Sequence, residues 1–137
     1  MKIFISAIVL FSLSLQVFSC TNLARHVDRI KASRSSALRM AKRDANIPRG
    51  HHPIKVESVP MTYPSGKPII KDGRRIMTRE YHYKNAKGDR IVIQEHTAGH
   101  DFGNGAGEGP HFNVRPASDI RHGLVEGTRA HYPVAVD

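Results

Sequence analysis

An uncharged segment near the amino terminus limits how much of the chain is left to build a folded core. Lys2 is followed by a run without charge over residues 3–18, and then by Ser19 and Cys20. One positive charge, a short apolar run and small residues ahead of a polar segment are the layout of a secretory signal. The run is shorter than the roughly 20 apolar residues that span a bilayer. We therefore expect residues 1–19 to be a signal peptide that is cleaved near Ser19/Cys20, and the protein to be secreted.

The same segment has a second interpretation, in which Cys20 is the lipid-attachment site of a bacterial lipoprotein. Phe18 fits the pattern before such a cysteine poorly, so we prefer simple cleavage. Because Cys20 is the single cysteine of the chain, neither an intrachain disulfide framework nor a four-cysteine zinc site is possible. Any metal must therefore be held by histidine, carboxylate or carbonyl groups.

The hydrophobic pattern predicts one α+β domain, over about residues 33–132, with helices ahead of a small sheet. In the basic segment 20–50, apolar residues recur at helical spacing after Asn22 and again after Ser33, until Pro48 ends the pattern. A chain of this length can bury one small core. No segment after the signal has the length and apolarity of a transmembrane helix.

Residues 51–137 are expected to form the antiparallel sheet. Pro60 cannot donate a ladder hydrogen bond, so the strand that contains it should lie at an edge. Asp72-Gly73 and the segment 85–88 are turn signals. The expected elements are an edge strand over residues 54–61, a hairpin that pairs residues 75–83 with residues 89–96, a short strand over residues 111–115 and an irregular tail from residue 116.

The strand over residues 90–96 ends in polar side chains and leads into a glycine-rich segment. Side chains of a strand alternate between its two faces. Ile91, Ile93 and Glu95 should therefore share one face, and Val92, Gln94 and His96 the other. The segment that follows, residues 97–110, has five glycines among its 14 residues, which no ordinary connection needs. Glycine adopts conformations that other residues resist, so this loop can either wrap around a ligand or move.

Four groups suited to phosphodiester chemistry lie within 17 residues: Glu95, His96, His100 and His111. Cutting a phosphodiester needs a nucleophilic water, a base and positive charge at the leaving oxygen. A neutral imidazole suits the base, because its unperturbed pKa lies near the working pH. A divalent ion held by a carboxylate and imidazoles supplies the charge. An ordinary surface role stays open for each histidine, and the roles of His122 and His131 are undecided.

Basic residues are concentrated in the first part of the chain. Residues 20–90 contain 17 Lys and Arg against six Asp and Glu, whereas residues 91–137 contain three against six. A basic surface attracts phosphate backbones by releasing counterions, whatever the base sequence, although the same charge also serves solubility alone. The candidate nucleic-acid contacts are Arg39, Lys42, Arg43, Arg74, Arg75 and Arg115.

Two runs of residues carry a resemblance to a known family: QEHTAGH over residues 94–100 and GPHFNVRP over residues 109–116. Together with residues 33–48 and 76–81, they resemble the toxin tips of bacterial polymorphic toxin systems. The group most similar to them is the HNH/endonuclease VII superfamily group marked by an acidic-His pair and two further histidines. The resemblance covers about residues 33–132, and its motifs occur together and in order.

This resemblance implies a metal-dependent nuclease that damages nucleic acid in a target cell. Glu95 and His96 match the acidic-His pair, which implies His96 as general base and Glu95 as metal ligand or orienter. His100 and His111 match the two further histidines, which would complete the metal site or contact the phosphate. The implied catalytic residues are thus His96, Glu95 and His111, and the implied ligands of a Mg²⁺, Mn²⁺ or Zn²⁺ ion are Glu95, His100 and His111.

The fold implied is a degenerate ββα-metal core of the HNH kind. That superfamily usually places its last metal ligands on a helix, whereas residues 112–116 are expected to be extended, which leaves both this geometry and metal dependence open. We expect a secreted endonuclease that favours DNA over RNA and is neutralised by an immunity protein. The alternatives are a metal-independent ribonuclease, with two of the three clustered histidines as base and acid, and a non-catalytic polyanion-binding protein.

Overall fold

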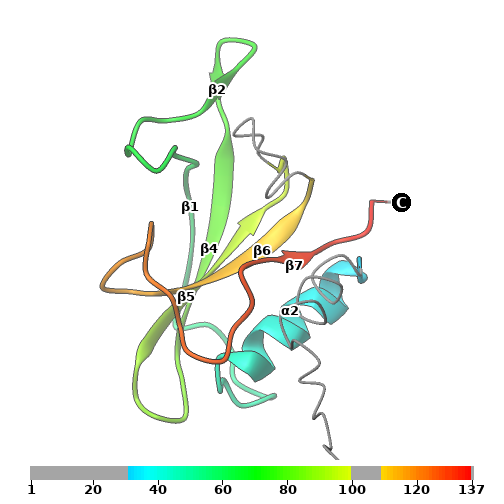
Figure 1. Ribbon diagram of the computed structural model, residues 1–137, viewed down its shortest axis with the longest axis vertical. Helices are drawn as coiled ribbons and strands as arrows, with labels where there is room; N and C mark the ends of the chain where they lie inside the picture. Colours follow the sequence, from blue (N-terminus) through cyan, green and yellow to red (C-terminus); the bar gives the residue numbers. More distant parts are fainter. Residues whose placement is uncertain (1–30, 100–108, 137) are drawn as a thin grey trace, which may run out of the picture.

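The computed structural model describes residues 31–99 and 109–136, which form one helix and two antiparallel sheets (Figure 1). The elements in chain order are α2 (Arg34–Asp44), β1 (Lys55–Pro60), β2 (Ile70–Lys71), β3 (Arg74–Arg75), β4 (Met77–Lys84), β5 (Arg90–His96), β6 (His111–Pro116) and β7 (Tyr132–Pro133).

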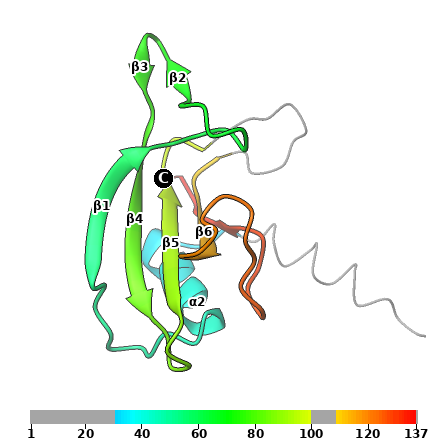
Figure 2. The ribbon, with the colours of Figure 1, turned by 90° about the vertical axis from the view of Figure 1, so that its left-hand side faces the viewer.

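The larger sheet is antiparallel throughout and has the strand order β1-β4-β5-β6-β7. Its central strand β5 pairs with β4 so that Arg79 lies opposite Glu95, and with β6 so that His96 lies opposite His111. β2 and β3 form a separate hairpin that projects beyond the end of this sheet (Figure 2). The turn of this hairpin is Asp72-Gly73, and both residues have positive φ, as a two-residue hairpin turn requires.

Helix α2 begins and ends at residues suited to the two ends of a helix. The side chain of Ser33 caps the start by accepting a hydrogen bond from the backbone N–H three residues on. At the other end, Asn46 has a φ of 57°, and its N–H bonds to the carbonyl of Arg43. The N–H of Ile47 bonds to the carbonyl of Lys42, which completes a Schellman arrangement. These local contacts explain why the helix stops before Pro48.

The hydrophobic core lies between α2 and one face of the larger sheet. Ala37 and Ala41 of the helix are fully buried, and their small side chains let the helix approach the strands closely. The buried members of the core are Ala37, Ala41, Ala45, Ile47, Tyr81, Tyr83, Ile91, Ile93, Phe112, Val114 and Tyr132. The hydroxyl of Tyr132 donates to Asp44 at 3.0 Å and so ties β7 to the end of the helix. Burial raises the pKa of this phenol, which therefore stays a neutral donor.

The structure confirms most of the elements predicted from the sequence. The helix after Ser33, the edge strand that contains Pro60, the hairpin of β4 with β5 and the strand β6 are all present. The helix predicted after Asn22 and the signal peptide lie outside the described residues, so one of the two expected helices is observed. The tail after residue 116 is irregular except for β7, a strand that the sequence did not predict.

No helix follows the glycine-rich segment within residues 109–136, where β6 is extended. The order of elements in the described parts of the chain therefore does not contain the last helix of a ββα-metal core. None of the helices in the described residues is long and apolar enough to cross a membrane. The domain boundaries expected from the sequence stay a prediction.

Candidate functional site

The two faces of β5 carry different chemistry. Ile91 and Ile93 point into the core beneath α2, and Glu95 shares their face, where it contacts Arg34 of the helix. Gln94 and His96 point to the opposite face, where both line a cavity of about 380 Å³. The alternation predicted from the sequence is therefore present, and it separates Glu95 from His96.

His96 and His111 form a buried pair on the cavity side of the sheet. They lie opposite each other on β5 and β6, so their side chains share one face. His96 Nδ1 and His111 Nε2 are 3.2 Å apart, and the ring planes meet at 82°. The exposed fractions are 8% for His96 and 2% for His111. The strand register therefore places two imidazoles in direct contact, away from bulk water.

The hydrogen bonds of this pair decide where its protons lie. His111 Nδ1 is 2.8 Å from the carbonyl oxygen of Gly109, and a carbonyl only accepts, so this nitrogen carries a proton. Neutral His111 then accepts at Nε2, and His96 donates from Nδ1. The basic lone pair of neutral His96 is consequently on Nε2. Asn113 also approaches His96 Nδ1, at 3.3 Å, and its oxygen would accept from that N–H if the amide were turned over.

A third imidazole, from His131, extends the pair. The rings of His111 and His131 are 4.8 Å apart and perpendicular, and His131 lines the same cavity as His96. His131 directly precedes β7, which pairs with β6 so that Phe112 lies opposite Tyr132. The sequence left the role of His131 undecided, because a two-residue strand gives no periodic signal.

Two arginines give this cavity a cationic wall. Arg115 follows His111 and Asn113 on the same face of β6, and its Nη1 donates to the carbonyl of Gly123 at 2.9 Å. Burial lowers the pKa of Arg115, but an arginine remains cationic at neutral pH. Arg121 lies against Gly66, where an added Cβ would be 3.0 Å from its Nη1. An imidazole cluster beside two guanidinium groups can both move a proton and hold a phosphate.

Glu95 is held on the other face by a buried network. Arg34 donates to both of its carboxylate oxygens, and the hydroxyl of Tyr81 donates to Oε2 at 2.6 Å. Burial alone would raise the pKa of Glu95, but the hydrogen bonds from Arg34 and Tyr81 outweigh it, so the pKa falls below its usual value. The ionised carboxylate therefore fixes β5 to α2, and the structure does not bring it to His96 or His111. His100 lies outside the described residues.

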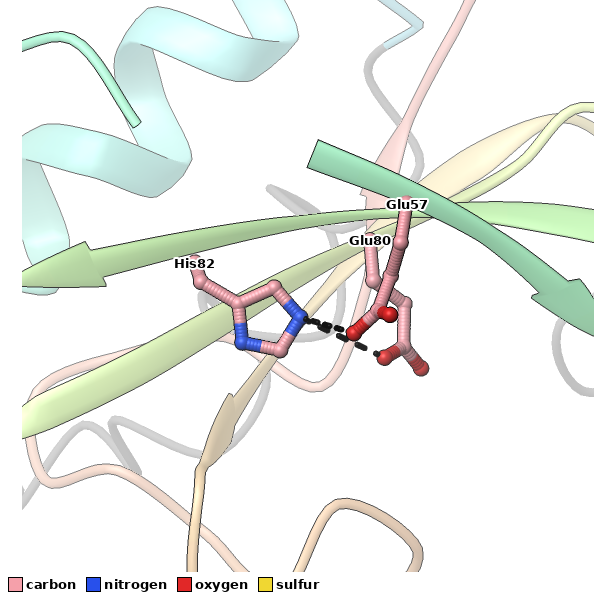
Figure 3. A group of neighbouring side chains, drawn as sticks. All are labelled: Glu57, Glu80 and His82. Carbon is pink, nitrogen blue, oxygen red and sulfur yellow. Dashed lines mark ion pairs between the residues drawn. The ribbon is translucent and has the colours of Figure 1, made fainter. Parts of the chain in front are cut away.

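A separate group of possible metal ligands lies at the β1 edge of the sheet. Glu57 of β1 and Glu80 and His82 of β4 bring one ligand atom each within 4.8 Å of the others (Figure 3). Within residues 31–99 and 109–136, no other group of three histidine, cysteine or carboxylate ligands meets this limit. The sequence analysis missed this cluster, although the spacing of Glu80 and His82 on a strand places them on one face.

Most of the predicted nucleic-acid contacts lie away from the cavity. Arg39, Lys42 and Arg43 belong to α2, which covers the opposite face of the sheet. Lys42 bonds to the carbonyls of two loop residues, and Arg43 pairs with Asp44 at 2.9 Å. Arg74 and Arg75 are exposed on the projecting hairpin. Arg115 alone among the six predicted contacts lines the cavity with the histidines.

Comparison with known proteins bears on this site directly. Residues 69–134 match the family of HNH/Endo VII superfamily nuclease toxins. This segment belongs to that family. The match begins just ahead of β2 and ends just after β7. It therefore contains His96, His111 and His131 and both cavity arginines, whereas α2 and β1 precede it. The chain matches no curated protein and no solved structure. The resemblance seen in the sequence is thereby confirmed, and the family to which this segment belongs consists of nuclease toxins.

Proposed function

We propose that this protein is an exported endonuclease toxin that hydrolyses phosphodiester bonds of nucleic acid, with DNA as the favoured substrate. The observation that carries the proposal is the buried His96–His111 pair, which opens on a cavity with Arg115 and Arg121 inside a segment of a nuclease toxin family. Export rests on the signal-like residues 1–19. An immunity protein that protects the producing cell is part of the same proposal.

In this proposal His96 is the general base. The proton arrangement of the pair leaves its lone pair on Nε2, which takes the proton of the attacking water. As His96 becomes cationic, His111 continues to accept the hydrogen bond from Nδ1 and stabilises the charge. Arg115 and Arg121 bind the phosphate oxygens and favour the extra negative charge of the transition state. Glu95 acts as an orienter, because its ion pair with Arg34 fixes the strand on which His96 lies.

A divalent ion, when bound, supplies positive charge at the scissile phosphate and the leaving oxygen. The ligands implied by the resemblance do not form a set among the described residues. Glu95 is on the far face of the sheet, and both ring nitrogens of His111 are engaged, one with Gly109 and one with His96. Metal dependence therefore rests on the family, whose HNH nucleases generally use a divalent ion.

A metal-independent ribonuclease is the second candidate, and the direct contact of His96 and His111 favours it. Two adjacent imidazoles can serve as base and acid without a metal, because the unperturbed pKa of an imidazole lies near neutral pH. The cationic wall of the cavity suits either substrate.

A cleavage panel on the purified protein tests both candidates. Plasmid DNA and RNA are incubated with Mg²⁺, Mn²⁺, Zn²⁺ or excess EDTA, for the wild type, His96→Ala and the control His122→Ala on the exposed side chain of His122. The leading proposal expects metal-dependent nicking that His96→Ala abolishes and His122→Ala leaves intact. RNA cleavage that persists in EDTA supports the ribonuclease. Salt-dependent binding without cleavage under any condition contradicts both candidates and leaves a polyanion-binding protein.

A further inference from the structure

We propose that Glu57, Glu80 and His82 bind a divalent transition-metal ion, Mn²⁺ or Zn²⁺, at the edge of the sheet. Glu57 lies directly opposite Glu80 in the pairing of β1 with β4. His82 follows Glu80 by two residues and therefore lies on the same face of β4. Figure 3 shows the two carboxylates and the imidazole converging from these two strands. The site does not depend on the role proposed for His96.

Each carboxylate has one oxygen fixed by a donor and the other turned toward the imidazole. Glu57 Oε2 is 2.7 Å from Lys55 Nζ, and Glu57 Oε1 is 2.8 Å from His82 Nε2. Glu80 Oε1 accepts from Gln94 Nε2 at 2.9 Å, and Glu80 Oε2 is 3.8 Å from His82 Nε2. Metal-binding carboxylates are typically oriented by such outer hydrogen bonds. Lys55 and Gln94 therefore hold two oxygens in place around one imidazole nitrogen.

His82 Nε2 is the atom that both carboxylates face. It is buried, and no contact that it makes meets the geometry of a hydrogen bond, although Glu57 Oε1 is close. A buried nitrogen without a hydrogen bond is costly. A metal ion coordinated by its lone pair and by the two facing oxygens would satisfy it.

The charge balance of the cluster also favours a cation. Two carboxylates lie directly opposite each other, an arrangement that is destabilising in a sheet when the charges are alike. The Glu80 side chain is only 5% exposed, so water screens it little. Lys55 pairs with Glu57 and supplies one positive charge. A divalent ion between the carboxylates would remove the remaining repulsion.

The donor set decides which metals fit. Two carboxylate oxygens and one imidazole nitrogen suit Mn²⁺ and Zn²⁺, because imidazole favours transition metals over Mg²⁺ and Ca²⁺. Three protein ligands leave further positions for water. Glu80 and Gln94 also line the cavity that contains His96, so a bound ion would fix one wall of that cavity. Glu57 precedes the residues that match the nuclease family, whereas Glu80 and His82 lie within them.

The test is a titration of the purified protein with Mn²⁺, in which calorimetry and electron paramagnetic resonance of free Mn²⁺ measure binding. A second titration with Zn²⁺ is measured by calorimetry. Glu57→Gln and His82→Gln remove one ligand each, and either should weaken binding at least about tenfold. His122→Gln is the matched control, because His122 is an exposed histidine whose Nδ1 is 3.9 Å from Asp119, and it should bind like the wild type. Thermal denaturation of each variant without metal shows whether it is folded.

Two results would overturn the edge site: a wild type that binds neither ion, and binding by folded Glu57→Gln and His82→Gln that equals that of the wild type. The variant His96→Ala separates this inference from the proposed nuclease. If His96→Ala alone loses Mn²⁺, the ion is in the cavity, which refutes the edge site and supports a metal in the nuclease. If the edge variants lose Mn²⁺ while no protein cleaves nucleic acid, the edge site stands and the nuclease does not.

Discussion

Glu95 and His96 are neighbours in the chain, but their side chains lie on opposite faces of the five-stranded sheet. Glu95 contacts Arg34 of α2, and His96 contacts His111 of β6. In the proposed function, the acidic residue therefore acts on the site through the strand that both residues share. Its ion pair holds β5 against the helix, and the backbone then presents His96 to the cavity.

This separation predicts different outcomes for two adjacent substitutions. His96→Ala removes the proposed base and should lower the rate of plasmid nicking at least about a hundredfold. Glu95→Gln weakens the contacts with Arg34 and Tyr81 and should lower the free energy of unfolding by about 1 kcal/mol. This is less than is usual for hydrogen bonds to a charged group, because Arg34 is half exposed. Nicking rates and melting temperatures of the two variants check this. If Glu95→Gln and His96→Ala lost the same factor in nicking rate and were equally stable, Glu95 would take part in the reaction itself.

The pH dependence of stability should report the same ion pair. The pKa of Glu95 is lowered in the folded protein, because the hydrogen bonds from Arg34 and Tyr81 outweigh the effect of burial. Its contribution to stability is therefore fully present above the ordinary glutamate pKa of about 4.3 and is lost as the pH falls through the lowered value. Melting temperatures between neutral and strongly acidic pH should fall less steeply for Glu95→Gln than for the wild type. If the melting temperature of Glu95→Gln fell as steeply with decreasing pH as that of the wild type, Glu95 would not be a main cause of acid sensitivity.

The sequence predicted those features that depend on local signals. The helix after Ser33, the turn at Asp72-Gly73 and the alternation of β5 each involve residues close in the chain, and the structure contains all three. The same alternation already implied that Glu95 and His96 point apart. The resemblance groups the two residues by proximity in sequence, which does not bring their side chains to one metal site.

Features that depend on long-range pairing could not be predicted in the same way. His131 reaches the cavity because β7 joins β6, and a two-residue strand has no periodicity to detect. Glu57 meets Glu80 only through the register of β1 on β4, which no local pattern specifies. The basic residues of α2 were assigned to nucleic acid by charge alone, and charge does not indicate which face of a domain carries the site.

The start of the glycine-rich segment offers a test of local geometry. Gly99 has a φ of 62°, and a Cβ there would lie 2.7 Å from the backbone of Gly109, the residue whose carbonyl accepts from His111. Gly99→Ala should therefore displace Gly109, disturb the proton arrangement of the histidine pair and lower the nicking rate. Gly50→Ala is the control, since nothing lies within 4 Å of its Cβ. Activity assays and the NMR signals of the His111 ring measure the effect. If Gly99→Ala were indistinguishable from Gly50→Ala, the close approach of residue 99 to Gly109 would have no effect on the histidine pair.

Binding of nucleic acid should depend on the cavity face rather than on the helix face. Arg121 and His131 both line the cavity, whereas Arg43 lies on α2 and pairs with Asp44. If Arg121 contacts a phosphate, Arg121→Gln should weaken DNA binding and reduce the slope of log K against log salt by about 1. Arg43→Gln removes the same charge from the opposite side and should leave the slope unchanged. Fluorescence anisotropy with labelled DNA at several salt concentrations measures both slopes, and the use of His96→Ala as the background prevents cleavage during the titration. A larger loss for Arg43→Gln would instead place the nucleic acid across α2, as the charge distribution of the sequence first suggested.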